Sequence, residues 1–177
     1  MGQSRNRNVM RKDEKPIFLV GFMGAGKTTV GQILARRLGY AFLDLDSVIE
    51  NRTGKTVQQI FAEQGEREFR RLEREAIGCC RELKNSVIAL GGGAFVSEEN
   101  RKTLGEIGVT VWLDCPLEIC LERVGGDGSR PLLGGATEMR SLHDRRRPAY
   151  ALADYVAQTG ACSPEEVALE ITRLLRR

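Results

Sequence analysis

The chain has 177 residues, the size of one ordinary domain, and 41 % of them are hydrophobic while 29 % are charged. A formal net charge of +3 does not indicate a nucleic-acid partner, and no apolar run reaches the roughly eighteen residues of a membrane span. The N-terminus shows no apolar segment of the kind that directs secretion. We therefore expect a cytoplasmic protein without membrane or nucleic-acid partners, and a monomer because nothing indicates an obligate interface.

Residues 1–15 are basic and lack any periodic pattern, which predicts a disordered leader before a single domain at residues 16–177. Apolar runs predict strands at residues 17–20, 41–45, 86–90, 109–113 and 155–158. Helical spacing is found at residues 27–38, 66–83, 97–104, 116–123, 137–152 and 163–175. Because strands and helices alternate and several strands are apolar throughout, the sequence predicts an α/β fold with a doubly wound, five-stranded parallel sheet.

A phosphate-binding motif, G-x-x-x-x-G-K-[ST], occupies residues 21–28, directly between the first predicted strand and the first predicted helix. Its glycines allow backbone N–H groups to turn toward an anion, and the following helix presents its positive end to the same anion. Lys27 can reach the β- and γ-phosphates, and the Thr28 hydroxyl can bind a magnesium ion. The motif predicts a nucleoside-triphosphate site made of Gly24, Ala25, Gly26, Lys27, Thr28 and Thr29.

Two carboxylates, Asp44 and Asp46, come at the end of the second predicted strand, where ligands of such sheets gather. Alternation along a strand would point both side chains the same way, with Leu45 opposed. One acid can hold magnesium, directly or through water, and the other can orient a hydroxyl nucleophile. Helix capping is the alternative, because Asp46 precedes a short helical stretch, but a cap alone does not account for two acids.

An arginine and a run of glycines give less direct signals. Arg70 belongs to a helix with i,i+4 pairs such as Glu66–Arg70, which favours a solvated face over a fork that binds a carboxylate. Residues 91–93 are three consecutive glycines that follow the third predicted strand. They indicate a close backbone approach, here to a ligand held by main-chain N–H groups, since a tight turn seldom needs three glycines.

The glycine-rich residues 124–129 interrupt the alternating pattern and predict a mobile lid at about 123–136. An ordinary surface loop is the alternative. Arginines around this stretch could close over phosphates or bind an anionic substrate, although a basic surface would give the same residues: Arg123, Arg130, Arg145, Arg146 and Arg147. The five cysteines are an odd number without a C-x-x-C pair and are predicted to be buried and reduced. His143 is predicted to lie on the solvated surface without a role.

These features predict a small-molecule kinase, because the N-K-x-D motif of switch GTPases is absent. From about residue 17 to the C-terminus, the ordered motifs resemble the shikimate kinase family, in the nucleoside monophosphate kinase structural class. The resemblance rests on the phosphate loop and on residues 42–46, 52–54, 60–61, 65–66, 69–70, 91–93, 130–133 and 146–150. It implies transfer of the γ-phosphoryl group of ATP to the 3-hydroxyl of shikimate, with Mg²⁺ as cofactor, in the chorismate pathway to aromatic amino acids.

The resemblance also implies roles for individual residues. Thr28 would bind Mg²⁺, with Asp44 supporting it through water, while Arg123 and Arg130 would approach ATP. Shikimate would be bound by Asp46, Arg70, Gly92, Gly93 and Arg146. For Arg70 the resemblance thus implies a position in the site and not on the solvated helix face that its sequence neighbours favour. Lys27, Asp46 and Arg130 would be the catalytic residues, with Asp46 orienting the attacking hydroxyl first and acting as a base second.

Two alternatives remain open at this point. One is a related kinase of the gluconate type, which would not be expected to carry the Asp-x-Asp, Phe-Arg, triple-glycine and Arg-x-Pro-x-Tyr motifs together. The other is a catalytically idle relative that binds nucleotide or a protein partner. The joint presence of Lys27, Thr28, Asp44, Asp46 and Arg130 argues against it.

Overall fold

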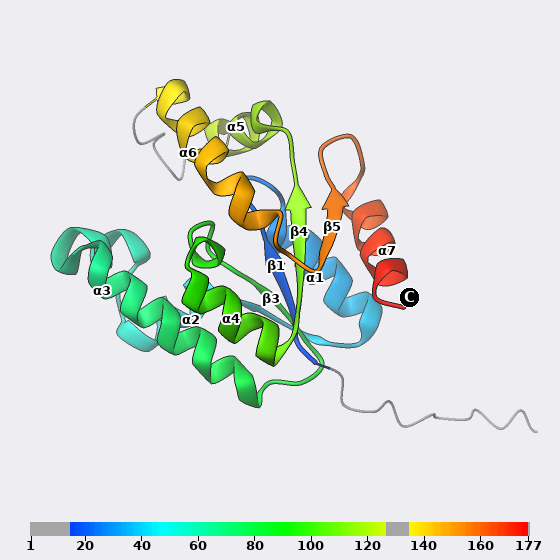
Figure 1. The fold of residues 1–177 in the computed structure, drawn as a ribbon, viewed down its shortest axis with the longest axis horizontal. Coiled ribbons are helices and arrows are strands. Elements are labelled where there is room, and N and C mark those ends of the chain that lie inside the picture. The colour runs from blue at the N-terminus through cyan, green and yellow to red at the C-terminus, as the bar shows by residue number, and fades with distance from the viewer. Residues whose placement is uncertain (1–14, 127–134, 177) are drawn as a thin grey trace, which may run out of the picture.

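The structure is a computed structural model that describes residues 15–126 and 135–176. Within these ranges, parallel strands form one sheet in the order β2-β3-β1-β4-β5. The strands are β1 (Ile17–Val20), β2 (Ala41–Asp44), β3 (Ser86–Ala89), β4 (Val109–Asp114) and β5 (Tyr155–Gln158). Helices cover both faces of this sheet (Figure 1), which confirms the predicted doubly wound α/β fold.

The centre of the sheet explains the continuous apolar runs in the sequence. β1 pairs with β3 on one side and with β4 on the other, and every residue of β1 and β3 is buried. A strand that is covered on both faces accepts apolar side chains at each position and therefore shows no alternation. Because all pairings are parallel, the carboxyl ends of the strands meet at one edge, where ligands of such sheets bind.

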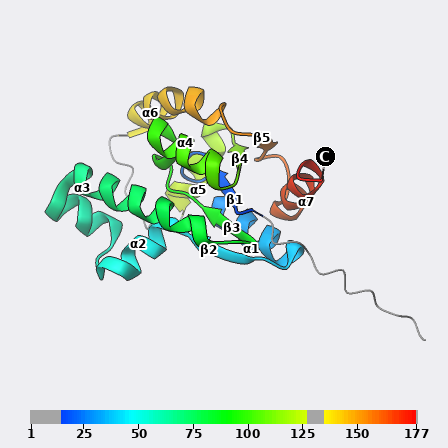
Figure 2. The ribbon, with the colours of Figure 1, turned by 60° about the horizontal axis from the view of Figure 1, so that its bottom comes forward.

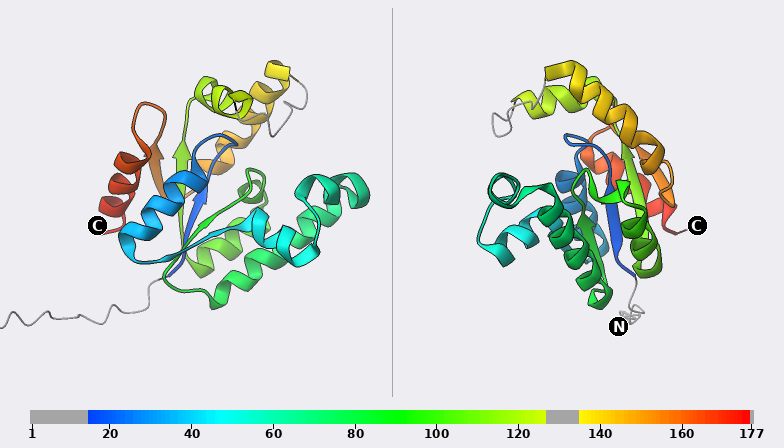
Figure 3. Two further views of the ribbon diagram at one scale, coloured as in Figure 1. Left: turned by 180° about the vertical axis from the view of Figure 1, so that it is seen from behind. Right: turned by 60° about the vertical axis from the view of Figure 1, so that its left-hand side comes forward.

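The helices of the described ranges are α1 (Lys27–Leu38), α2 (Leu45–Thr53), α3 (Val57–Cys79), α4 (Glu98–Ile107), α5 (Leu117–Gly126), α6 (Gly135–Tyr150) and α7 (Pro164–Leu174), with short 3-10 turns η1 (Cys80–Glu82) and η2 (Ala94–Val96). α1 and α7 pack together on one face of the sheet, as the rear view in Figure 3 shows, and α4 lies on the other face. α5 and α6 lie beyond the carboxyl ends of the strands, while α2 and the first half of α3 project past β2 (Figures 1 and 2).

The segment between β2 and β3 differs most from the sequence prediction. The pattern predicts a helix over residues 66–83, whereas α3 begins at Val57 after a capping box between Thr56 and Gln59. Gly65 inside α3 has a φ of 81°, a left-handed conformation that bends the helix and shifts its apolar spacing. The second predicted strand is one residue too long, because α2 starts at Leu45 immediately after β2.

The prediction for the cysteines is only partly right. Cys80, Cys115 and Cys120 are buried, but Cys79 and Cys162 are exposed. Cys79 is the neighbour of Cys80 at the end of α3, and adjacent helical positions point in different directions.

The prediction of a solvated His143 is wrong. Its exposed fraction is 7 %, and its ring meets the Phe22 ring edge-on with the centroids 5.2 Å apart. The ring nitrogen Nδ1 lies 3.2 Å from a carboxylate oxygen of Asp144. The neighbouring arginines suggested a solvated stretch, but residues 144 and 145 are exposed on α6 while His143 is on its buried face.

Two further predictions concern segments outside the described residues. They are the leader, apart from residue 15, and the residues 127–134 of the predicted lid, which include Arg130. In the part of the chain that the structure describes, no helix is both long and apolar enough to cross a membrane.

Candidate active site

The phosphate loop follows β1 and leads into α1, as its motif predicts. Gly24 and Gly26 have φ values of 76° and 93°, in the left-handed region that favours glycine. A Cβ atom on Gly24 would lie 2.5 Å from the backbone oxygen of Cys120, so this position has no room for a side chain. No side chain caps the start of α1, and its N-terminal end adjoins the loop that the motif assigns to phosphate.

Lys27 bends back over the phosphate loop. Its Nζ donates to the backbone oxygens of Gly21, at 2.9 Å, and Phe22, at 2.8 Å. These carbonyl contacts hold the ammonium group over the concave side of the loop, where the motif places the phosphates of a bound nucleotide.

Thr28 and Asp44 meet beside the loop, although sixteen positions separate them in the chain. The Thr28 hydroxyl donates to Oδ2 of Asp44 over 3.0 Å, while Oδ1 of Asp44 accepts from the backbone N–H of Asp46 over 3.1 Å. Asp44 is thus the N-cap of α2. The sequence analysis offered Asp46 as the capping residue, and that alternative is wrong. Asp44 therefore both caps α2 and accepts from Thr28, and Asp46 is the first-turn residue whose backbone N–H the cap receives.

A cleft of about 520 Å³ lies at this edge of the sheet. Its walls come from the phosphate loop, from β2 and α2, from the end of β3 and from α5. The lining residues are Met23, Gly24, Gly26, Lys27, Thr28, Thr29, Asp44, Asp46, Ala89, Leu90, Gly91, Gly92, Arg123 and Val124. The cleft therefore brings the predicted phosphate site and both predicted aspartates together.

The three glycines after β3 are each covered by one side chain from another part of the chain. A Cβ atom on Gly91 would lie 2.8 Å from Oδ1 of Asp46, and one on Gly92 would lie 3.1 Å from Nη1 of Arg146. At Gly93 the same atom would lie 2.5 Å from Nη2 of Arg70. The three glycines thus leave room for a carboxylate and two guanidinium groups. This packing accounts for three consecutive glycines where a tight turn alone would not need them. The sequence analysis explained the run by a ligand held on main-chain N–H groups and did not foresee this packing.

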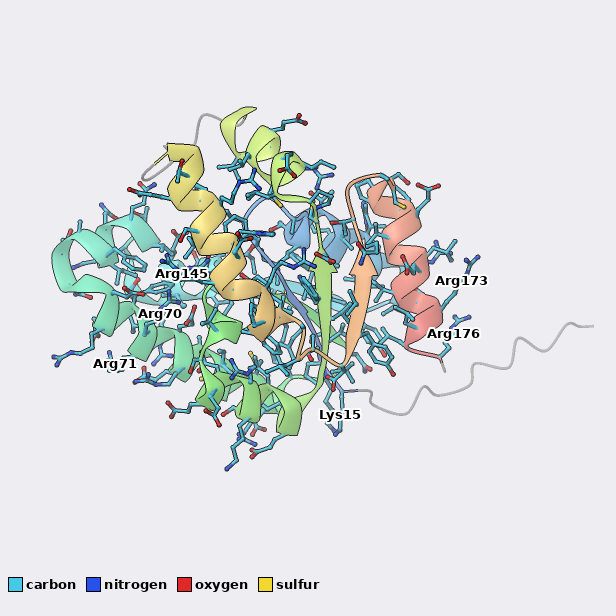
Figure 4. The ribbon with its side chains drawn as sticks, turned by 45° about the horizontal axis from the view of Figure 1, so that its top comes forward. Lys15, Arg70, Arg71, Arg145, Arg173 and Arg176 are labelled. Atoms are coloured by element: carbon cyan, nitrogen blue, oxygen red, sulfur yellow. The ribbon has the colours of Figure 1, made fainter. Side chains whose placement is uncertain are left out.

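The predicted solvated face for Arg70 is wrong. Its side chain is 26 % exposed, and it lies on the side of α3 that faces α6, whereas Arg71 is on the outer side (Figure 4). The expected pair with Glu66 is present at 3.2 Å, but Nη1 also donates to both carboxylate oxygens of Glu73, each over 3.0 Å. Arg70 is therefore held in a fixed orientation by two acids of its own helix.

Glu73 is a residue of this site that the sequence analysis missed. It is 1 % exposed, and burial raises the pKa of its carboxyl group while the Arg70 charge lowers it and Asp46 raises it further. Burial also disfavours the charge on Arg70, but the Glu73 carboxylate reverses this and raises the pKa of Arg70. The available signal was a glutamate three positions after Arg70 on the apolar stripe of α3.

Of the three consecutive arginines on α6, Arg146 is the one that reaches the glycine run at residues 91–93. Its guanidinium group lies 6.0 Å from the centre of the Phe22 ring and beside Gly92. Arg147 instead stacks on Trp112 at 5.1 Å, and Arg145 is exposed (Figure 4). The register chosen from the Arg-x-Pro-x-Tyr motif is the one that the packing of α6 produces.

Arg123 lies at the phosphate loop, where its Nη1 donates to the backbone oxygen of Gly24 over 3.2 Å. It also borders a second, smaller cavity of about 160 Å³. The walls of that cavity are Ala25, Gly26, Thr29, Val30, Arg123, Thr159, Cys162, Pro164 and Val167. Cys162 lines the cavity, whereas the Gln158 amide donates to Asp114 over 3.1 Å.

The fold and the site together define a class of protein. A phosphate loop, a hydroxyl–carboxylate pair beside it, and a carboxylate and two guanidinium groups gathered over a nearby glycine run are the parts of a P-loop kinase that acts on a small acceptor.

Comparisons with known proteins narrow this class. The family model described as shikimate kinase matches residues 23–176. A shikimate kinase of Persephonella marina is 44 % identical over 90 % of this chain and 98 % of its own length, and one of Moorella thermoacetica is 46 % identical over 90 % and 94 %. A solved structure, the Acinetobacter baumannii shikimate kinase in complex with shikimate, is 40 % identical with a TM-score of 0.84 over 92 % of this chain and 93 % of its own. The chain belongs to the shikimate kinase family.

Proposed function

We propose that this protein transfers the γ-phosphoryl group of ATP to the 3-hydroxyl of shikimate, giving 3-phosphoshikimate and ADP. The carrying observation is the convergence of Asp46, Arg70 and Arg146 over residues 91–93, at the edge of the sheet where the phosphate loop also lies. Shikimate carries a carboxylate and ring hydroxyls, which match two guanidinium groups and one carboxylate. The relative whose structure contains shikimate supports the same acceptor.

On the donor side, backbone N–H groups of the phosphate loop and Lys27 would bind the phosphates of ATP. The Thr28 hydroxyl and the Asp44 carboxylate fit a magnesium ion, because they are hard oxygen donors 3.0 Å apart on the wall of the cleft. The described residues contain no cluster of three or more potential metal ligands, which suits an ion that completes its shell with water and phosphate oxygens. When bound, Mg²⁺ supplies charge neutralisation at the transferring phosphoryl group.

On the acceptor side, Arg70 and Arg146 would bind the carboxylate of shikimate, and the N–H groups of Gly92 and Gly93 would bind its oxygens. Asp46 would then accept a hydrogen bond from the attacking hydroxyl and orient it toward the γ-phosphate. Phosphoryl transfer depends on positioning and charge stabilisation more than on a strong base, so orientation is the main role of Asp46.

Two arginines would complete the donor side. Arg123 adjoins both the phosphate loop and the smaller cavity, which is placed to receive the nucleoside part of ATP. Arg130 lies outside the described residues, and its proposed approach to the γ-phosphate from a lid rests on the family resemblance alone. Lid closure would exclude water and suppress hydrolysis of ATP. A cytoplasmic monomer is proposed as the working form.

The test is ADP release by the purified protein with MgATP and one of four additions: shikimate, gluconate, a nucleoside monophosphate, or no acceptor. Release that requires shikimate supports the proposal. Release that requires gluconate would identify the gluconate-type alternative. Release that is independent of every acceptor, or absent with shikimate, would mean that the acceptor site has been misassigned or that the protein is idle.

A further inference from the structure

A tyrosine at the end of α6 contacts the backbone of the glycine run at residues 91–93. Tyr150 is 1 % exposed, and its hydroxyl donates a short hydrogen bond to the backbone oxygen of Gly92, 58 positions earlier in the chain. Its ring packs against Trp112 with the centroids 6.1 Å apart. The hydroxyl is therefore fixed both by packing and by its acceptor.

The backbone of residues 91–93 needs such support because glycine peptides rotate easily. The peptide between Gly91 and Gly92 is held by the N–H of Ala94, which donates to Gly91 over 3.0 Å. The next peptide, between Gly92 and Gly93, has its carbonyl held by Tyr150. One peptide plane is thus fixed by a local backbone turn and the other by a side chain from a distant helix.

The direction of the Gly93 N–H follows from this contact. No peptide bond of the described residues is cis, and in a trans peptide the N–H points away from the carbonyl. Because the Gly92 carbonyl points to Tyr150, the Gly93 N–H points away from Tyr150. Gly93 is also the glycine that lies under the guanidinium group of Arg70.

Tyr150 also lies near the second guanidinium group of the acceptor site, close enough for its charge to act on the hydroxyl. Arg146 is four positions earlier, on the same face of α6. Burial raises the pKa of Tyr150 to about 12, and the charge of Arg146 acts in the opposite direction. The guanidinium group of Arg146 lies over Gly92, where a Cβ atom would be 3.1 Å from its Nη1.

We propose that Tyr150 is a positioning residue of the acceptor site, whose hydroxyl fixes the Gly92–Gly93 peptide beneath the guanidinium group of Arg146. The inference rests on the proposed acceptor, since these are the groups assigned to shikimate. Tyr150 would act through the peptide that it holds and not by contact with a substrate.

The test compares Tyr150→Phe with Tyr155→Phe, which makes the same chemical change on β5. Tyr150→Phe keeps the ring on Trp112 and removes only the hydroxyl. We expect its KM for shikimate to rise about tenfold while its KM for ATP stays within twofold of wild type, because one anchoring hydrogen bond is lost on the acceptor side. Tyr155→Phe should change neither KM. The inference is overturned if Tyr150→Phe leaves the KM for shikimate within twofold, or if both KM values rise together as the thermal midpoint falls.

A second measurement separates this inference from the proposed function. In the ¹H–¹⁵N spectrum of the substrate-free full chain, Tyr150→Phe should shift or broaden the Gly93 amide much more than the Gly92 amide, because only the Gly93 peptide loses its hydrogen bond. Equal or absent changes at the two glycines would overturn the inference. If wild type does not phosphorylate shikimate, the proposed function fails, and the comparison of the two amides still decides whether Tyr150 orients the peptide.

Discussion

The donor and acceptor halves of the cleft are built in different ways. Most of the donor half comes from one contiguous segment, β1, the phosphate loop and the start of α1, and much of it is backbone, while Asp44 of β2 and Arg123 of α5 join it from elsewhere. The acceptor half joins α2, α3, α6 and residues 91–93, and its binding groups are largely side chains. A contiguous backbone motif keeps its geometry wherever the local sequence is kept. A group of side chains from four segments depends on how those segments pack.

This difference predicts that the two halves can be damaged separately. Substitutions in the acceptor half should weaken shikimate binding and leave nucleotide binding unchanged. The predictions below use that separation, and they run from the largest expected effect to the smallest.

Asp46→Asn should lower kcat by about 10²–10⁴-fold, because Asp46 is the group proposed to orient the attacking hydroxyl. ATP binding should change little, since the carboxylate that Thr28 contacts beside the phosphate loop is that of Asp44. Steady-state kinetics and titration with an ATP analogue measure the two quantities. Near-normal turnover would remove Asp46 from the mechanism.

Arg70→Ala should weaken shikimate binding by about 2–4 kcal/mol, as expected when a charge-assisted anchor for a carboxylate is removed. The matched control is Arg71→Ala, because Arg71 is the next residue of α3 and pairs with Glu68 and Glu75 on the outer side. Calorimetric titration with shikimate should separate the two variants clearly. Equal affinity in both would return Arg70 to a purely structural role.

Gly93→Ala should reduce shikimate affinity by about tenfold, because a Cβ atom there forces Arg70 out of position. The atom would lie 2.5 Å from Nη2 of Arg70. Gly105→Ala on α4 is the control, since no atom lies within 4 Å of the corresponding Cβ. ADP affinity should stay at the wild-type value in both variants. A parallel loss of ADP affinity in Gly93→Ala would show that the halves are not separable.

Glu73→Gln tests the buried carboxylate that holds Arg70. Burial raises the pKa of Glu73, so the folded chain binds this proton more tightly than the unfolded chain does. Its contribution to the free energy of unfolding is therefore fully present below the ordinary glutamate pKa and is lost as pH rises through the folded-state pKa. The free energy of unfolding of wild type, relative to that of Glu73→Gln, should fall as pH rises from the ordinary glutamate pKa to the raised pKa of folded Glu73. Urea unfolding at several pH values measures this difference.

The control is Glu106→Gln, for which the stability difference from wild type should change with pH in the opposite direction. Arg81 lowers the pKa of the exposed Glu106 through a hydrogen bond. Wild type should therefore gain slightly on Glu106→Gln as pH rises from the lowered pKa of Glu106 to the ordinary glutamate pKa, and the gain should stay constant above it. A difference that changes in the same direction for both glutamates would contradict the assignment for Glu73.

The contrast between the donor half and the acceptor half also explains which features the sequence could predict. The strands and the phosphate loop were found almost to the residue, because their signals are local: continuous apolar runs and a fixed spacing of glycines and lysine. Arg70 could not be placed from its neighbours, since the pair with Glu66 suits a solvated helix equally well. Its inward orientation depends on the approach of Gly93, which is 23 positions away in the chain.

Other features were missed for the same reason. Tyr150 and His143 acquire their contacts only when α6 packs on Gly92 and Phe22. The first part of α3 was missed because the left-handed Gly65 interrupts its periodicity. Family resemblance supplied the acceptor-site residues that residue-by-residue reasoning left open, while the packing of each glycine under one side chain came from the structure.

The central claim is that Arg70 binds the carboxylate of shikimate, and the most direct measurement is a comparison of shikimate with its methyl ester in wild type and in Arg70→Ala. Wild type should favour shikimate by about 10²-fold or more in kcat/KM, because the ester lacks the charge that the guanidinium group recognises. Arg70→Ala should lose most of this preference, since the variant lacks the partner of that charge. An undiminished preference for shikimate in Arg70→Ala would contradict the account.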